Sequence, residues 1–164
     1  DGEFANSCLI STFAPGELGN SLAELHRLIQ DTEKKCFAVS GSYSLPAQDV
    51  AAFLRREKCL KNFRSSCRVG ITPGRIDEII MPQLYNALAS AAKEFDSRMK
   101  GFIKEGKFIG VESCVSSPVR FERIPEKLHS TLSGLYLSGE GCGAAGGIIS
   151  AACDGIKCAL AMLK

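Results

Sequence analysis

The sequence of 164 residues lacks the patterns that would place it in a membrane or outside the cell. No run approaches the ~18–20 consecutive apolar residues that a membrane-spanning helix needs, because Asp154 and Lys157 interrupt the most apolar window, residues 143–163. The first residues show no basic stretch followed by an apolar core, which is the pattern of a secretory signal. A formal net charge of +2 makes no general case for nucleic acid as a partner. We therefore expect no membrane association and a cytoplasmic location.

Histidine is scarce, and the abundant cysteines do not have the spacing of a zinc site. The two histidines are His26 and His129, and the eight cysteines form no C-x-x-C pair, whereas structural zinc sites combine such pairs with further ligands. Several cysteines stand in apolar surroundings, where cysteine behaves as a small core residue. We predict no metal site and a reduced, cytosol-like compartment rather than a disulfide scaffold. The cysteines in apolar surroundings are Cys8, Cys36, Cys153 and Cys158.

The residues up to 105 are rich in helical patterns. Apolar residues recur at helical spacing over 21–35, 47–56 and 72–95, and each segment is predicted to be a helix. Pro82 lies inside the third pattern and should kink it or split it. A β-rich segment at 7–14 precedes them and predicts a strand.

The character of the sequence changes from residue 107 on. β-Formers dominate 107–115 and 119–124, which predicts two strands. We therefore expect an α+β fold, partly α/β, with a helix-rich part at 1–105 and a second part at 106–164.

The one basic cluster lies at 55–68 and leaves two interpretations open. It contains six basic side chains and the ring of Phe63. Basic residues interleaved with an aromatic ring are one pattern of nucleic-acid binding, so the alternative function is a stand-alone module for nucleic acid or another anionic partner. A solvated loop between helices is the simpler interpretation. The basic residues are Arg55, Arg56, Lys58, Lys61, Arg64 and Arg68.

A glycine-rich stretch near the C-terminus carries the strongest functional signal. A short apolar run at 135–137 predicts a buried strand, and five glycines follow within residues 139–147. An apolar segment at 148–163 then predicts a buried helix. A strand, a glycine turn and a helix start form an anion or dinucleotide cradle, because glycine lets the backbone approach the ligand and the first helical N–H groups point at it.

Several motifs together resemble the C-terminal part of a family of FAD-dependent dehydrogenases, which are bacterial and plastid flavoproteins of mostly unassigned substrate. The most specific ones are S-S-P-V-R at 116–120, G-L-Y at 134–136, G-E-G at 139–141 and G-G-I at 146–148, with S-A-A at 150–152 and D-G at 154–155. Further matches upstream are P-A-Q at 46–48, G-I-T-P at 70–73, G-F at 101–102 and G-V-E at 110–112. The resemblance covers most of the chain.

The resemblance implies an oxidoreductase of two parts, a Rossmann-type FAD domain built from both ends of a longer chain and an inserted cap domain. Such proteins carry a G-x-G-x-x-G turn for the pyrophosphate at their N-terminal end, and this chain has none near its start. We therefore expect a C-terminal fragment, with part of the cap or substrate domain at 1–105 and a segment of the FAD domain at 106–164. Its partner would be the missing N-terminal half of the FAD domain, and alone it should be inactive and bind FAD weakly or not at all. The substrate and the catalytic residues stay open, and a plant or algal source would place the protein in the plastid stroma.

The resemblance also implies roles for individual residues. Glu140 would accept hydrogen bonds from the ribityl hydroxyls or lie by the pyrophosphate. The backbone at Gly146, Gly147 and Ile148 would face the pyrimidine ring of the flavin, where the helix dipole favours the negative charge of reduced flavin. Gly139 and Gly141 would let the cofactor approach the backbone closely. Ser117 and Arg120 would lie on the flavin or substrate side. For the glycines the alternative is tight packing alone, and for Arg120 it is a solvent-facing position.

Four positions depart from the family pattern and bring catalytic competence or the substrate into question. Cys142 stands where the family has Ala, Ala144 where it often has Tyr, and Cys114 with Val115 where it often has Arg-Thr. Cys142 is either a redox thiol at a helix start or a small residue that fills an alanine site. The helix at 148–163 is apolar on most sides, so without a covering partner it should be exposed or cause self-association.

Overall fold

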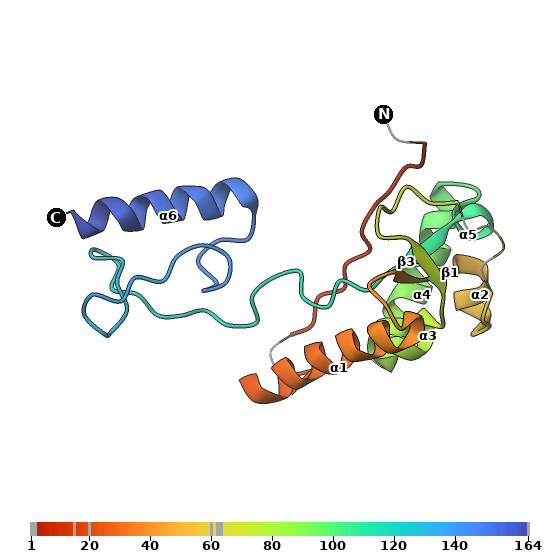
Figure 1. Cartoon of the computed structure of the whole chain (residues 1–164), viewed down its shortest axis with the longest axis horizontal. Coiled ribbons are helices and arrows are strands. Elements are labelled where there is room, and N and C mark those ends of the chain that lie inside the picture. Colours follow the sequence, from red (N-terminus) through yellow and green to blue (C-terminus); the bar gives the residue numbers. More distant parts are fainter. Residues whose placement is uncertain (1–2, 15, 20, 60, 62–63, 164) are drawn as a thin grey trace. The chain divides into compact units, whose positions relative to one another are not determined.

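The computed structural model describes residues 3–14, 16–19, 21–59, 61 and 64–163. The chain divides into two compact units, which consist of residues 1–20 with 26–113 and of residues 21–25 with 114–164 (Figure 1). The described residues contain six helices and three strands. The predicted α+β class is therefore confirmed. No helix in these ranges is long and apolar enough to cross a membrane.

A three-stranded mixed sheet lies at the centre of the first unit. Its order is β2 (Ile71–Pro73), β1 (Leu45–Asp49) and β3 (Lys107–Ile109). β1 pairs in parallel with β2 and antiparallel with β3. The predicted helix at 47–56 is thus wrong in its first three residues, because 47–49 belong to the central strand, where all three pair with β3 and Ala47 also pairs with β2, and the helix begins only at residue 50.

The helices of the first unit follow the periodic segments of the sequence. The helix predicted from residue 72 is wrong at its start, however, because 71–73 form strand β2 and helix begins only at Ile76. The longest are α1 (Leu22–Ser40) and α4 (Pro82–Arg98), and three short ones accompany them. Pro82 stands at the first helical position of α4, so the expected interruption is a complete break after α3. The short helices are α2 (Val50–Arg55), α3 (Ile76–Ile79) and α5 (Phe102–Glu105).

The core of the first unit gathers around one phenylalanine. Phe53 of α2 is fully buried and packs with Ile76 and Ile80. Its ring lies 4.9 Å from the ring of Tyr85 and 4.8 Å from that of Phe108, measured between centroids. The core therefore joins α2, α4 and the sheet, and fixes the first unit.

The second unit consists of loops and one helix, and here the predicted strands at 119–124 and 135–137 are wrong. Residues 119–124 form no strand, and residues 135–137 contribute a single bridge, between Tyr136 and His129. The described residues of 7–14 in the first unit also form no strand, and 107–115 is β only at 107–109. β-Forming residues make a strand only where a neighbouring strand accepts their backbone hydrogen bonds, and these segments lie beside none.

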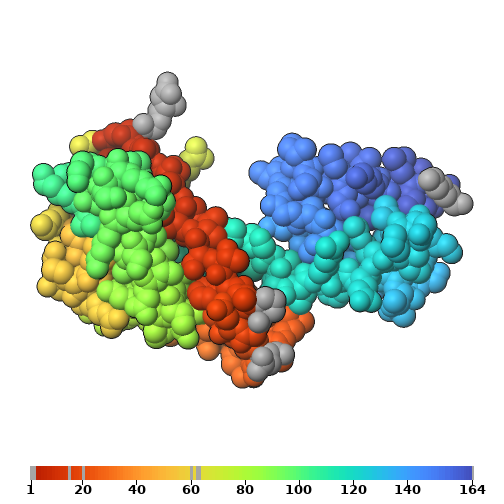
Figure 2. Space-filling view, turned by 180° about the vertical axis from the view of Figure 1, so that it is seen from behind, coloured from red at the N-terminus to blue at the C-terminus, as the bar shows by residue number. Residues whose placement is uncertain are grey.

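The predicted C-terminal helix is present as α6 (Ile148–Met162), but it is exposed rather than buried. The side chain of Ile148 is 89% exposed and that of Leu163, just past the helix, is 84% exposed. In the space-filling view the dark-blue atoms of α6 are uncovered along the visible face (Figure 2). The apolar sequence of α6 thus forms a surface in this chain.

Candidate functional site

The five glycines form a folded turn, residues 139–147, that leads into α6. Gly143 N–H donates to the Glu140 carbonyl at 2.8 Å, and Ala144 N–H donates to the Gly139 carbonyl at 3.2 Å. Gly139 and Gly143 have φ angles of 81° and 74°, which L side chains rarely adopt. We call residues 139–147 the glycine turn.

The segment at 117–121 lies directly against the glycine turn. A Cβ atom on Gly143 would lie 2.2 Å from the carbonyl oxygen of Val119, so only glycine fits there. Phe121 N–H donates to the Cys142 carbonyl at 3.0 Å. Ser117 Oγ lies 2.9 Å from the Val119 carbonyl oxygen and 3.1 Å from the Gly141 carbonyl oxygen, so its single hydroxyl proton is shared between these two acceptors. The two segments therefore form one layer, which the sequence separation of about twenty residues did not reveal.

The Asp154 carboxylate of α6 binds both Arg123, in an ion pair, and the first residue of the glycine turn. The two guanidinium nitrogens Nη1 and Nη2 each donate to one carboxylate oxygen at 3.0 Å. The side chains are only 16% and 13% exposed. Arg123 also donates to the Leu137 carbonyl at 3.2 Å, and Gly139 N–H donates to Asp154 Oδ2 at 2.9 Å. One carboxylate thus fixes both the arginine and the first glycine of the turn.

The two charged groups of this pair stabilise each other's charged form. The hydrogen bond from Arg123, followed by that from Gly139 N–H, holds the pKa of Asp154 below its ordinary value. The hydrogen bond to Asp154 in turn raises the pKa of Arg123. Because the charges cancel locally, the pair is suited to hold the turn in place rather than to meet a charged ligand.

The N-terminus of α6 offers free backbone donors beside the glycine turn. Gly147 caps the helix in an extended conformation without a side-chain hydrogen bond. The first helical hydrogen bond is from Ala151 N–H to the Gly147 carbonyl, at 2.8 Å. Within the described residues the N–H groups of Ile148, Ile149 and Ser150 have no acceptor. They form the positive end of a helix of 15 residues, a surface that favours an anion or an electron-rich group.

Two glycines of the turn have no reason inside this unit to be glycine. Neither Gly141 nor Gly146 has a positive φ, and a Cβ atom on either would meet nothing within 4 Å. A glycine that is neither strained nor crowded leaves the backbone open to something outside the unit. The surface at Gly141 and Gly146 is therefore suited to close contact with a ligand or a covering segment.

Comparisons with known proteins agree with this resemblance to flavoproteins. Residues 1–115 match the family described as FAD-dependent protein, C-terminal domain-like. The chain belongs to this family. An uncharacterized protein of Clostridium beijerinckii is 34% identical over 164 aligned residues, which are 97% of this chain and 31% of that protein. The chain therefore spans about a third of the length of this relative, and it is associated with FAD through its family.

The residues predicted to contact FAD divide into an inner and an outer set. The Ser117 hydroxyl contacts the Gly141 carbonyl of the glycine turn, and the Gly139 N–H donates to Asp154. Arg120 and Glu140 are exposed, and neither side chain has a partner among the described residues. The structure thus brings Ser117 to the turn and leaves the two charged groups available at its surface.

Three glycines of the turn, Gly141, Gly143 and Gly146, fit the glycine spacing of a dinucleotide fingerprint. Residues 141–146 read G-C-G-A-A-G, which has the spacing G-x-G-x-x-G. The fingerprint needs a strand before the turn and a helix after it. Only the helix is present, since 135–137 forms an isolated bridge. The spacing alone therefore gives no complete Rossmann unit among the described residues.

Three of the positions that depart from the family pattern have defined places. Cys142 is 6% exposed and its thiol donates to the Gly139 carbonyl at 3.3 Å, so it lies inside the turn. Cys114 is exposed and donates to the Ser116 carbonyl at 2.9 Å. Val115 is exposed beside it. Sequence reasoning missed the pair of Arg123 and Asp154, although an arginine next to apolar residues in a β-forming segment and an aspartate inside an apolar helix were both visible.

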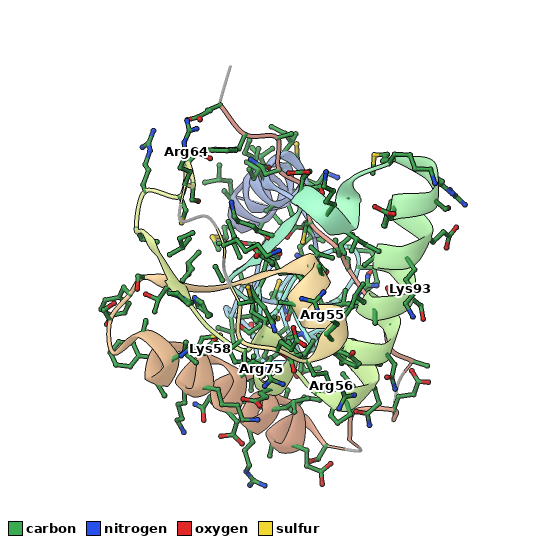
Figure 3. All side chains as sticks on the ribbon, turned by 90° about the vertical axis from the view of Figure 1, so that its right-hand side faces the viewer. Arg55, Arg56, Lys58, Arg64, Arg75 and Lys93 are labelled. Carbon is green, nitrogen blue, oxygen red and sulfur yellow. The ribbon has the colours of Figure 1, made fainter. Side chains whose placement is uncertain are left out.

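The basic residues at 55–68 do not gather at one place. Arg55 pairs with Glu57 at 2.8 Å, and Arg64 pairs with Glu3. Arg56 lies over the ring of Tyr85, 4.3 Å from its centroid. Figure 3 shows Arg64 far from Arg55 and Arg56. Phe63, the aromatic residue of the cluster, lies outside the described residues. Among the residues that are described, no three metal-binding side chains come together.

Proposed function

We propose that this chain supplies the flavin side of a divided FAD site in an oxidoreductase. The glycine turn and the start of α6 take the ribityl chain and the flavin ring, and the first unit is part of the substrate or cap domain. The observation that carries this proposal is the free N-terminus of α6 beside Gly141 and Gly146. Nothing inside the unit requires glycine at these two positions, because a Cβ atom would meet no other atom within 4 Å there. Membership of an FAD-dependent family supports the identity of the cofactor.

Each residue at this surface has a role that suits its chemistry. The exposed carboxylate of Glu140 accepts hydrogen bonds from the ribityl hydroxyls. The N–H groups at 148–150 face the pyrimidine edge of the ring, and the helix dipole stabilises negative charge there. Arg120 lies at the flavin or substrate side, on the segment that Ser117 fixes to the turn. The flavin supplies hydride transfer when bound, and the protein supplies position and electrostatics.

The remaining half of the site belongs to another segment in this proposal. A complete site needs a strand, a glycine turn and a helix for the pyrophosphate, and the described residues contain no such unit. The relative of about three times the length supports a longer parent protein. The same missing segment would cover α6, whose apolar side chains are exposed. In its absence we expect self-association through α6, visible as a concentration-dependent elution volume in size-exclusion chromatography.

Titration of the isotopically labelled chain with FAD tests the proposal by NMR. We expect weak binding, with a Kd of roughly a millimolar, and shifts confined to the amides of the glycine turn and of residues 148–150. Gly146→Val should abolish these shifts, because its side chain covers open backbone. Gly155→Ala is the matched control, since its Cβ atom also meets nothing but lies inside α6.

Two results would contradict parts of this proposal. Shifts spread over α2 to α5, or none at the turn, would remove the glycine turn from the flavin site. A sub-micromolar affinity of the chain alone would show that no second half is needed. Oxidoreductase activity would have to be measured on a longer protein that contains this chain.

A further inference from the structure

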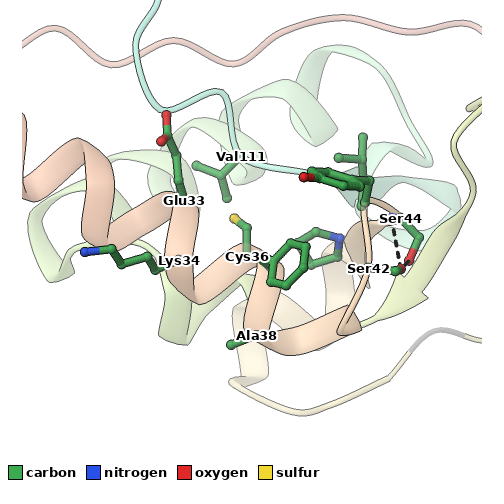
Figure 4. A pocket seen from close by; sticks show the side chains of 11 residues that line it. Glu33, Lys34, Cys36, Ala38, Ser42, Ser44 and Val111 are labelled. Carbon is green, nitrogen blue, oxygen red and sulfur yellow. Dashed lines mark hydrogen bonds between the residues drawn. The ribbon is translucent and has the colours of Figure 1, made fainter.

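The first unit contains an open cavity of about 500 Å³ that has no part in the proposed flavin surface. It lies between the last turns of α1, the loop after it, the start of β1 and Val111 (Figure 4). Its lining residues all belong to the first unit. Cavities of about 300–1,000 Å³ are the usual size of small-molecule sites.

The walls of this cavity are mainly apolar. Phe37 and Tyr43 meet edge to face, with ring centroids 5.5 Å apart, and Leu45, Pro46 and Val111 complete the apolar wall. Such a wall favours aromatic rings, which gain from edge-to-face contacts in addition to burial. The lining of the cavity therefore favours a molecule with an apolar, aromatic body.

The polar groups of the cavity are mostly engaged with each other. Ser42 Oγ and Ser44 Oγ lie 3.0 Å apart, and Ser44 Oγ lies 2.6 Å from Thr72 Oγ1. Figure 4 shows the dashed Ser42–Ser44 contact at one side of the cavity. A hydroxyl or carbonyl group of a ligand can form a hydrogen bond with this short chain of hydroxyls. A ligand therefore needs no more than one polar group on this side.

No charged group points into the centre of the cavity. The ammonium group of Lys34 points away from Cys36, and the Glu33 carboxylate is turned aside (Figure 4), where it accepts a hydrogen bond from Ser113 Oγ at 2.8 Å. Burial, followed by the nearby Glu33 charge, raises the pKa of the Cys36 thiol, so this group is neutral at pH 7. A charged ligand would lose its hydration here without gaining an opposite charge.

We propose that this cavity binds a neutral, largely apolar small molecule that carries an aromatic ring, seated against Phe37, Tyr43 and Cys36. The inference does not rest on the flavin proposal, because the two sites share no residue. It assigns the first unit a ligand class that the family description does not give.

Fluorescence titration of the chain with N-phenyl-1-naphthylamine, a neutral aromatic dye, tests the proposal. We expect saturable binding of one dye per chain. Cys36→Phe fills the cavity and should weaken binding more than tenfold, and Tyr43→Ala should weaken it about three- to tenfold. Tyr43 is 85% exposed, so this second variant should keep its fold even if the first does not.

The exposed face of α6 is the competing dye site and needs its own control. The double variant Ile156→Ser, Leu160→Ser removes two exposed apolar side chains from α6. Unchanged saturable binding in this variant supports the cavity. Binding that is lost in this variant but kept in Tyr43→Ala would overturn the proposal.

Alkylation of the cysteines gives a readout that does not depend on dye fluorescence. All eight cysteines are free, so mass spectrometry after limited iodoacetamide treatment reports each one against the other seven. Saturating dye should slow the modification of Cys36 at least fivefold and leave the exposed Cys114 and Cys153 unchanged. An unchanged rate at Cys36 under saturating dye would overturn the proposal.

Discussion

The two units of this chain are held together by different kinds of contact. In the first unit eight alanine, valine, isoleucine and phenylalanine residues of the described chain are buried, and Phe53 packs with Ile76 and Ile80 among them. In the second unit the buried apolar residues of the described chain are two cysteines, Cys142 and Cys158. The first unit is therefore fixed by an apolar core, whereas the second depends on one ion pair and on backbone hydrogen bonds.

The second unit combines a hydrogen-bonded glycine turn with an exposed apolar helix. The Arg123–Asp154 pair fixes the glycine turn to α6 but buries little apolar surface. The apolar side chains of α6 instead face outward. A unit with a precisely hydrogen-bonded turn and an uncovered apolar helix is suited to complete another structure, as the proposed divided FAD site requires.

The largest expected effect concerns the core of the first unit. Phe53→Ala should lower the free energy of unfolding by about 3–5 kcal/mol, because it removes a fully buried ring and leaves a cavity. Urea denaturation measures this change. Phe121→Ala is the control in the second unit, where the half-exposed ring should cost less than about 1 kcal/mol. Similar costs for the two variants would remove the distinction between the units.

A smaller effect is expected from breaking the ion pair of the second unit. Arg123→Met should cost about 2–3 kcal/mol, somewhat below the about 3–5 kcal/mol of a fully buried pair, because Asp154 keeps its charge without its partner. Hydrogen exchange at the amides of 139–144 should accelerate, while exchange in α4 stays as it was.

Arg120→Met is the matched control for the ion pair. Arg120 is an exposed arginine of the same segment, and it has no partner among the described residues. Its replacement should change stability by no more than about 0.5 kcal/mol. If both arginine variants leave exchange at the turn unchanged, the pair does not hold the glycine turn.

The sequence predicts best those elements whose pattern is local. α1, α4 and α6 have long helical periodicity, and the start of α4 at Pro82 follows from the geometry of proline. At the start of α1, Ser21 and Glu24 form the two reciprocal hydrogen bonds of a capping box, both at 3.2 Å. These features depend on residues within a few positions of one another.

The features that sequence reasoning missed depend on distant partners. Residues 47–49 are a strand because segments near 72 and 108 pair with them, and the local apolar pattern fits a helix equally well. Arg123 and Asp154 are 31 positions apart, so their pairing follows from the fold and not from any motif. At the candidate site, the glycines and the helix start were predictable, whereas the group that positions them was not.

Two glycines of the turn should differ in their effect on stability, because the fold requires glycine at Gly143 but not at Gly141. Gly143→Ala should cost about 1–3 kcal/mol, since it combines a φ of 74° with a Cβ atom 2.2 Å from the Val119 carbonyl oxygen. Gly141→Ala should leave stability nearly unchanged, because its Cβ atom meets nothing within 4 Å. Thermal unfolding followed by circular dichroism compares the two. An equal loss in both variants would mean that Gly141 is also required by the fold.

The smallest expected effect is the acid sensitivity of the second unit. Because the pKa of Asp154 is lower in the folded than in the unfolded state, its stabilising contribution is complete above the unfolded value of about 3.9 and is lost as the pH falls through the lower, folded value. The NMR shift of the Gly139 amide, which donates to this carboxylate, should therefore titrate with a midpoint below that of an ordinary aspartate. Asp154→Asn should remove the titration, and a midpoint at or above the ordinary value would mean that Arg123 does not stabilise the carboxylate. In the first unit, burial acts to raise the pKa of Asp77, but the hydrogen bonds from Arg75 and Gln48 together outweigh burial, so this pKa is lowered too. The first unit should nevertheless stay folded at the pH where the Gly139 amide shift reports half-protonation of Asp154, because the apolar core of the first unit does not titrate.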